Sequence, residues 1–287
     1  MPAAPAAQTL AHARSFLFVP ADRPERYAKA LASGADAVII DLEDAVAPGS
    51  RDAARDILRS AWAGLPAADR ARVLVRINGE GTPCHGGDVA LVRDLAMQGL
   101  GGTMLPKAEG PQVLAALAAA CPGTALLPQI ESGAGLDALD PIARAPGVLR
   151  LCLGHLDLQN DLGIRCGPDE AELAPARWDM VRASRRAGLA PPVDSVTVDT
   201  HTPEAMAHDS ARALRMGFGG KLCIHPAQVA AVHTAFTPDA AQQDWARQVL
   251  AAAAAAGGAA CTVDGRMVDT PVITVAQRTL ARAARVS

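Results

Sequence analysis

Ala125-Leu-Leu-Pro-Gln-Ile-Glu131 and Leu149-Arg-Leu-Cys-Leu-Gly-His-Leu-Asp157 are two apolar runs, each closed by an acidic residue. Such runs are typical of the buried strands of a parallel sheet. Side chains just past the carboxyl ends of those strands converge on one face, where α/β enzymes keep their active sites. Two carboxylates delivered there by consecutive strands, Glu131 and Asp157, suit a hard cation such as Mg²⁺. Taken alone, either carboxylate could instead cap a helix or pair with an arginine.

Strand-like and helix-like segments alternate along most of the chain. Eight short apolar runs are expected to be strands, at residues 15–19, 37–41, 72–76, 102–105, 125–129, 149–153, 194–198 and 221–224. Segments with helical spacing lie between most of them, at 26–33, 51–62, 87–98, 112–119 and 177–187. This alternation predicts an α/β fold of the (β/α)₈ TIM-barrel type over residues 14–236. An open doubly wound sheet is the alternative, but it usually carries a glycine-rich turn after its first strand, where this chain has Phe18-Val-Pro-Ala-Asp22.

Polar residues of the types that bind ligands or catalyse reactions follow the expected strands and do not precede them, as a barrel active site requires. In chain order they are Asp22, Arg23, Glu43, Asp44, Arg76, Asn78, Lys107, Glu109, Glu131, Asp157 and His225. The glycines that precede several strands are better explained as tight helix-to-strand turns than as a phosphate cradle, because no P-loop pattern accompanies them.

The two ends of the chain are expected to lie outside the barrel. Residues 1–13 have neither a basic region nor a continuous apolar core, and are predicted to be a flexible N-terminal tail. Residues 237–287 are predicted to form a C-terminal helical lid or oligomerisation segment, with a helix at 240–256, a polar turn-rich loop after Gly257-Gly258 and a final helix. Asp269, in that loop, is a candidate catalytic residue or simply the cap of the last helix.

Composition argues against several classes of partner. The 287 residues carry a net charge of −3 and only eight aromatic side chains, so nucleic acid is not an expected partner. No uninterrupted apolar stretch is long enough to cross a bilayer, so no membrane partner is expected. The six cysteines contain no C-x-x-C pair, which is typical of a reduced, cytoplasmic protein.

Eight short motifs follow one another along the chain. They are Arg14-Ser-Phe-Leu-Phe-Val-Pro20, Asp41-Leu-Glu-Asp-Ala-Val46, Arg76-Ile-Asn78, Leu105-Pro-Lys107, Gln129-Ile-Glu131, Asp157-Leu-x-x-Asp-Leu-Gly163, Ile224-His-Pro-x-Gln228 and Gly265-Arg-Met-Val-Asp269. In this order they resemble the citrate lyase β-subunit-like family of the HpcH/HpaI aldolase superfamily, which includes malyl-CoA and citramalyl-CoA lyases. His155, Ser132 and residues 191–198 depart from the family pattern near the expected substrate pocket, which puts the substrate in question more than the fold.

The resemblance implies a TIM barrel in a homo-oligomer, a trimer or hexamer, whose C-terminal segment reaches a neighbouring subunit's active site. It also implies roles for individual residues. Glu131 and Asp157 would bind Mg²⁺, and Glu131 would also lie near the substrate. Arg76 would bind the substrate carboxylate, and Glu43, Asp44 and Lys107 would lie in the outer shell of the metal, where Glu43 and Asp44 hold its bound water. Phe18, Arg23 and Lys29 would contact coenzyme A, and Asp269 would be the acid/base catalyst.

These residue types suit cleavage of a C–C bond in a short hydroxyacyl thioester, giving an acyl-CoA and a 2-oxo acid. Mg²⁺ would stabilise the developing charge, Arg76 would grip a carboxylate and Asp269 would move a proton. The expected small-molecule partners are therefore a CoA thioester and a 2-oxo acid. Lyase, synthase and thioesterase directions share this chemistry.

Two alternatives to this function stay open. One is a class II aldolase that acts on free acids with a histidine base, such as His225. The other is a non-catalytic subunit that binds CoA or an oxo acid. If His225 is not the base, we expect it to be an orienting residue. We expect His155 to support the nearby metal ligand Asp157.

Overall fold

The computed structural model describes residues 5–257 and 259–284. The chain divides into two compact units, residues 1–232 and 233–287. The boundary predicted between residues 236 and 237 lies close to this division, at the end of helix α12 (Gln228–Phe236). Each unit has its own buried core and is described separately below.

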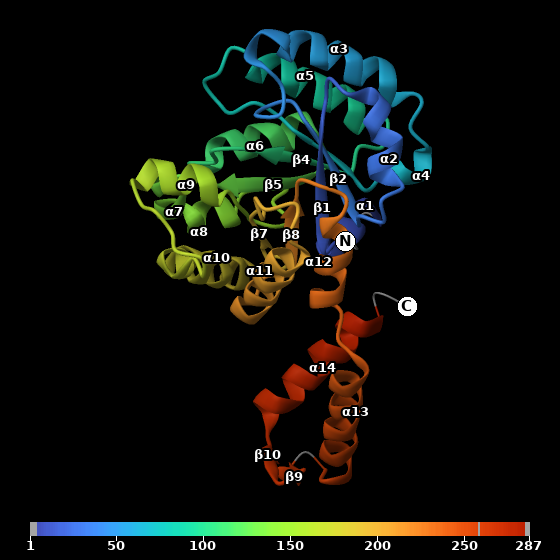
Figure 1. The fold of residues 1–287 in the computed structure, drawn as a ribbon, viewed down its shortest axis with the longest axis vertical. Coiled ribbons are helices and arrows are strands. Elements are labelled where there is room, and N and C mark those ends of the chain that lie inside the picture. Colours follow the sequence, from blue (N-terminus) through green and yellow to red (C-terminus); the bar gives the residue numbers. More distant parts are fainter. Residues whose placement is uncertain (1–4, 258, 285–287) are drawn as a thin grey trace. The chain divides into compact units, whose positions relative to one another are not determined.

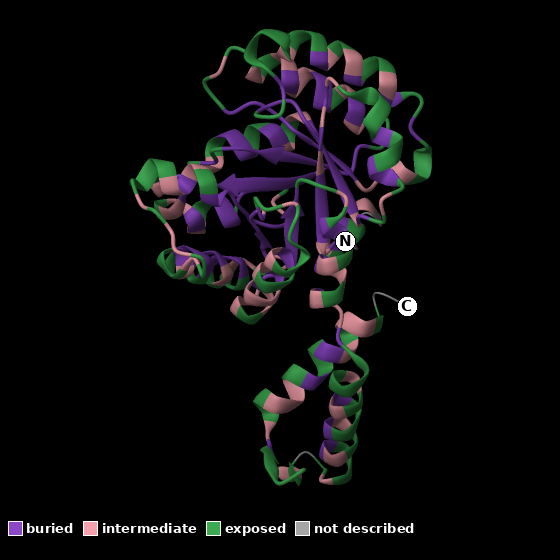
Figure 2. Ribbon diagram, viewed as in Figure 1, coloured by how far each residue is buried: buried purple, intermediate pink, exposed green. Residues whose placement is uncertain are grey.

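The first unit is a closed barrel of eight parallel strands in sequential order, which confirms the predicted fold (Figure 1). Its strands are β1 (Ser15–Pro20), β2 (Ala37–Asp41), β3 (Val73–Arg76), β4 (Gly102–Leu105), β5 (Ala125–Ile130), β6 (Cys152–Leu153), β7 (Val193–Asp194) and β8 (Gly220–Cys223). Figure 2 shows these strands as the most continuously buried part of the unit. One side chain from each strand fills the barrel interior, as expected for a packed core: Phe16, Ile39, Leu74, Met104, Leu127, Cys152, Val193 and Leu222.

Helices connect the strands on the outside of the barrel. They are α2 (Tyr27–Leu31), α3 (Arg51–Trp62), α4 (Ala67–Arg70), α5 (His85–Ala96), α6 (Pro111–Ala120), α7 (Gly133–Asp137), α8 (Leu139–Ala143), α9 (His155–Leu162), α10 (Ala174–Ala187) and α11 (Pro203–Met216), with single 3₁₀ turns at Pro24–Arg26, Pro48–Ser50 and Ala171–Leu173. Helix α3 has the predicted bounds, and α5, α6 and α10 lie within three residues of theirs.

Two strands are shorter than predicted. Residues 149–153 were expected to be one strand, but only Cys152–Leu153 pair as β6. Before β6 the chain keeps only an isolated parallel bridge between Leu126 and Val148, with the Leu149 N–H donating to the Leu126 carbonyl at 2.9 Å. The guanidinium of the buried Arg150 donates to the backbone carbonyls of Leu10, Ala13 and Pro191 at distances of 2.6–3.1 Å. Strand β7 starts at Val193, one residue earlier than predicted and directly after Pro191-Pro192, but it ends at Asp194, so residues 195–198 lie outside it.

The prediction of a flexible N-terminal tail is wrong for residues 5–13. Residues Pro5–His12 form helix α1. Leu10 and Ala13 are buried in the barrel's core cluster, where they close the amino-terminal end of the strands. Residues 1–4 lie outside the described part of the chain. The helix was missed because its single large apolar residue stands among alanines, which gave no clear periodicity.

The second unit is a pair of helices joined by a hairpin. Helix α13 (Ala240–Ala255) starts with a capping box between Asp239 and Gln242, and helix α14 (Thr270–Ala284) follows β9 (Cys261–Val263) and β10 (Arg266–Val268). The predicted turn-rich loop is therefore an antiparallel hairpin. Asp264 and Gly265 form its tip with φ of +47° and +73°, as a type I′ turn requires. None of the helices in the described ranges is long and apolar enough to span a membrane.

Candidate active site

A cavity of about 300 Å³ opens at the carboxyl ends of the barrel strands. Its wall contains both polar and apolar side chains. The polar residues are Asp41, Asp44, Arg76, Gln129, His155, Asp157 and Ser195, and the apolar ones are Phe18, Ala45, Leu156, Val196, Leu222 and Ile224. This location is where a TIM barrel places catalytic groups.

Arg76 lines the cavity, is buried and is bound to several neighbouring side chains. It ends β3 and lies beside Asp41, the last residue of β2, because the two are register partners. Its Nε and Nη2 donate to the two carboxylate oxygens of Asp41 at 2.7 and 2.6 Å, and its guanidinium lies 4.8 Å from the centre of the Phe18 ring. Nη1 contacts Glu43 at 3.1 Å and Asp44 at 3.5 Å. The Nε and Nη2 donors of Arg76 are therefore already used on Asp41, which leaves Nη1, now in contact with Glu43 and Asp44, as the donor for a substrate carboxylate.

Lys107 brings three carboxylates together. Its Nζ lies 2.9 Å from Glu43 Oε1, 3.8 Å from Glu131 Oε1 and 3.9 Å from Asp157 Oδ1. Since Glu131 and Asp157 both lie within 4 Å of one nitrogen, their carboxylates are less than about 8 Å apart and converge as predicted. Partial burial would lower the pKa of Lys107, but its carboxylate neighbours, Glu43 first, raise it above its ordinary value.

Glu131 follows β5 and is almost fully buried. Its Oε1 accepts the backbone N–H of Lys107 at 2.8 Å, and its Oε2 has no hydrogen-bond partner among the described residues. Burial, and then the charge of Glu43, raise the pKa of Glu131 to about 8. Gly154 makes room for this carboxylate, because a Cβ there would lie 2.2 Å from Glu131 Oε2. A buried, under-coordinated carboxylate oxygen of this kind is costly unless a cation or proton satisfies it.

A hard divalent cation fits this arrangement. The donors are carboxylate oxygens, which Mg²⁺ prefers, and the position between Glu131 and Asp157 already attracts a positive charge, the ammonium of Lys107. In the described ranges, no three acidic, histidine or cysteine side chains form a complete ligand set. A cation here would therefore keep several positions for water or substrate, as Mg²⁺ commonly does.

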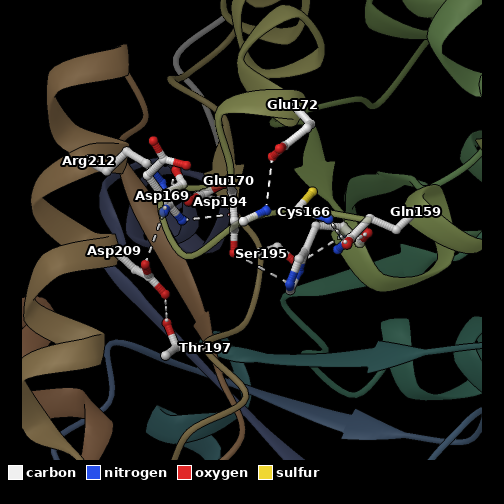
Figure 3. A network of polar contacts seen from close by, with 12 residues as sticks. Gln159, Cys166, Asp169, Glu170, Glu172, Asp194, Ser195, Thr197, Asp209 and Arg212 are labelled. Carbon is white, nitrogen blue, oxygen red and sulfur yellow. Dashed lines mark hydrogen bonds and ion pairs between the residues drawn. The ribbon is translucent and has the colours of Figure 1, made fainter. Parts of the chain in front are cut away.

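His155 lines the cavity and is bound to Ser195. It is buried, its backbone N–H donates to Ser195 Oγ at 3.1 Å, and its Nδ1 lies 2.5 Å from the same oxygen. Figure 3 shows Ser195, Asp194, Glu170 and Arg212 within one network of polar contacts, in which Arg212 contacts Glu170 at 2.9 Å. Burial lowers the pKa of His155. These contacts anchor the first turn of α9, which carries Asp157.

Comparisons with known proteins identify the family of this chain. Residues 14–226 match the family described as HpcH/HpaI aldolase/citrate lyase. The chain belongs to this family. A citrate lyase subunit beta-like protein of Deinococcus radiodurans is 36% identical over 282 residues, 94% of this chain and 97% of that protein. A (3S)-malyl-CoA thioesterase of Cereibacter sphaeroides is 31% identical over 273 residues, 94% of each chain.

Solved structures match most of the chain as well. The protein CitE from Mycobacterium tuberculosis, in complex with magnesium, acetoacetate and coenzyme A, is 35% identical with a TM-score of 0.83, covering 96% of this chain and 99% of that one. A citrate lyase beta subunit from the same organism, complexed with oxaloacetate and magnesium, is 34% identical with a TM-score of 0.68, covering 80% of this chain and all of the other.

Some residues that the family resemblance singled out lie apart from the cavity. Arg23 is exposed and pairs with Glu25 at 2.7 Å, and Lys29 is exposed on α2, so neither lines the cavity in the way Phe18 does. Asn78 is buried and donates to Asp88 and to the Leu42 carbonyl, which makes it part of the scaffold.

Two more predicted residues lie in structural roles. His225 is exposed, and its Nδ1 accepts the backbone N–H of Ala227, which fits an orienting residue at a turn better than a base. Asp269 belongs to the C-terminal unit. It precedes α14, and its Oδ1 accepts the Val272 N–H at 3.4 Å. This contact supports the interpretation of Asp269 as the cap of α14. A catalytic role for Asp269 stays a proposal.

Among the cavity residues that are polar or glycine, four had no individual role assigned from the sequence. Asp41, Gln129, Gly154 and Ser195 line the cavity, and Asp41 and Gln129 end or nearly end apolar strands. A buried polar residue at such a position was a usable signal for Asp41 and Gln129. Gly154 and Ser195 gave no comparable signal, because their importance depends on contacts between strands.

Proposed function

We propose that this chain is a Mg²⁺-dependent lyase, or the reverse condensing enzyme, for a short hydroxyacyl-CoA thioester. The reaction yields an acyl-CoA and a 2-oxo acid. The observation that carries the proposal is the convergence of Glu43, Glu131 and Asp157 on one ammonium at the barrel mouth, beside Arg76. CitE of M. tuberculosis, with magnesium, acetoacetate and coenzyme A, supports the ligand classes.

Glu131 and Asp157 would hold the cation. When bound, Mg²⁺ supplies a Lewis acid that stabilises negative charge on the carboxylate and adjacent oxygen of the substrate. Arg76 would bind the substrate carboxylate through Nη1, exchanging its contact with Glu43 for one with substrate. Asp41 would keep the guanidinium in place during that exchange, because it holds the other edge by two hydrogen bonds.

Cleavage also needs a group that takes the proton of the substrate hydroxyl. Removal of that proton lets the carbonyl of the oxo acid form while the C–C bond breaks, and the bonding electrons become the thioester enolate, which is then protonated. We assign this proton transfer to Asp269 of a neighbouring subunit in a trimer or hexamer, on the strength of the family resemblance. Asp269 lies in a polar hairpin-to-helix junction that the barrel does not need for closure.

Thioester hydrolysis is a second candidate, because relatives named (3S)-malyl-CoA thioesterase are 31–32% identical over nearly the whole chain. A class II aldolase is less well supported. It needs a histidine base in the barrel, whereas His225 is engaged in a turn and His155 is buried against Ser195.

One assay separates these activities. The protein is incubated with malyl-CoA or citramalyl-CoA, with Mg²⁺ or with EDTA, while 2-oxo acid and free CoA thiol are measured separately. A lyase produces 2-oxo acid without free thiol, and only with Mg²⁺. A thioesterase produces free thiol without 2-oxo acid. Equal rates for the wild type and for Glu131→Gln would overturn the proposed metal site, and no turnover of any thioester would overturn the proposed activity.

A further inference from the structure

Lysine is scarce in this chain, which makes the lysine in the carboxylate cluster unusual. Of 27 basic residues only Lys29, Lys107 and Lys221 are lysines. Arginine is the better partner for a single carboxylate, because its planar fork matches the two oxygens. An ammonium is instead a compact point charge that several carboxylates can surround, as they would a metal ion. Lys107 has this arrangement, with three carboxylates within 4 Å of Nζ.

The backbone of Lys107 contributes to the same arrangement. Its φ of +48° lies in the left-handed region, which side chains other than glycine and asparagine rarely adopt. In this conformation its N–H donates to Glu131 Oε1 at 2.8 Å, and its side chain returns to the same carboxylate and to Asp157. Backbone strain at a position of this kind is often linked to function.

We propose that Lys107 is an internal counter-ion of the cluster formed by Glu43, Glu131 and Asp157, and that its ammonium moves away from Glu131 and Asp157 when the divalent cation binds. This inference rests on the metal site of the proposed function. An ion about 2 Å from both carboxylates would repel an ammonium that lies less than 4 Å from the same oxygens. Lys107 can move because its side chain is 47% exposed. Glu43 remains available to it as its closest partner, at 2.9 Å.

Exposure of the Lys107 amine reports this movement in the wild-type protein. The protein is treated briefly with an amine-acetylating reagent, with and without Mg²⁺, and acetylation is quantified by mass spectrometry. We expect Mg²⁺ to raise acetylation of Lys107 several-fold. Lys29, which is exposed, should react equally in both conditions, and Lys221, which is 1% exposed, should stay unreactive. Unchanged acetylation of Lys107 at saturating Mg²⁺ would overturn the proposal.

Mg²⁺ affinity provides an independent test that requires no turnover. Lys107→Met should bind Mg²⁺ on the order of fivefold to tenfold more tightly in calorimetry, because the competing cation is lost. It should also have a lower Tm than wild type without Mg²⁺, with a smaller deficit when Mg²⁺ is saturating. Arg93→Met, which removes one charge from an exposed position on α5, should match wild type in both measurements.

The outcomes separate this inference from the function that it rests on. If Mg²⁺ binds wild type and Glu131→Gln weakens it, but Lys107→Met leaves affinity and Tm unchanged, Lys107 is not the counter-ion and the metal site stands. If Mg²⁺ binds neither wild type nor Lys107→Met, the metal site and this inference both fail.

Discussion

Gly154→Ala should disable the site while leaving the barrel folded. A Cβ at this position would lie 2.2 Å from Glu131 Oε2, whereas ordinary contacts begin at 3.4 Å. The carboxylate must therefore move by roughly 1 Å, and it cannot simply turn aside, because the new Cβ would also lie 2.7 Å from Glu131 Cβ and from Gln129 Nε2. A displacement of this size at a catalytic group costs about 100-fold in rate.

The assays are Mg²⁺ calorimetry and steady-state kinetics on the accepted thioester. Gly154→Ala should lose about 100-fold in kcat/KM, or about 2.7 kcal/mol of transition-state stabilisation, and should bind Mg²⁺ more weakly. Gly86→Ala is the matched control, since its Cβ would meet nothing within 4 Å on α5. Wild-type Mg²⁺ affinity and kinetics in Gly154→Ala would refute the assignment of Glu131 as a ligand.

Three further predictions concern single side chains. Arg76→Lys should lower kcat/KM by at least about tenfold, because one ammonium cannot bond both oxygens of Asp41 and also reach the substrate; wild-type kinetics on every accepted acid would refute this. Burial raises the pKa of Glu131 from 4.5 to about 8, so the folded, metal-free protein retains a proton that the unfolded chain releases. Its unfolding free energy in urea should therefore fall as pH rises from about 5 to about 8, and a Glu131→Gln variant with the same slope would contradict the shift. Asp269→Asn should keep its Mg²⁺ affinity and Tm but lose turnover, and mixing it with an Arg76→Ala protomer should restore some activity once subunit exchange is shown; no recovery would exclude a shared site.

The barrel could be predicted because its strands are short apolar runs with polar residues at one end. Glu131 and Asp157 were placed near each other by the same reasoning, since consecutive parallel strands deliver their C-terminal residues to one face. The Arg76–Asp41 pair follows equally from strand register, as both residues end neighbouring strands. The pair was not predicted, because Asp41 is the last residue within an apolar run and its carboxylate does not follow the strand.

Other features depend on contacts that no local pattern records. The burial of Leu10 depends on the open end of the barrel, which exists only after all eight strands have paired. The position of the Lys107 ammonium depends on a left-handed backbone at a residue type that rarely adopts it. The hairpin at Asp264-Gly265, in contrast, could have been predicted. An Asp-Gly pair flanked by alternating hydrophobic residues is a recognised signal for a tight hairpin turn.

Cation binding by Glu131 and Asp157 is tested most directly by an anomalous difference map from crystals soaked in Mn²⁺, which has the same preference for oxygen ligands as Mg²⁺. We predict one strong peak per barrel, about 2.0–2.3 Å from one carboxylate oxygen of Glu131 and one of Asp157, with the Lys107 ammonium displaced from both. Crystals of Glu131→Gln should show a weaker peak or none. A wild-type map with no peak between these two residues, at a Mn²⁺ concentration that saturates binding in solution, would contradict the metal site at the barrel mouth.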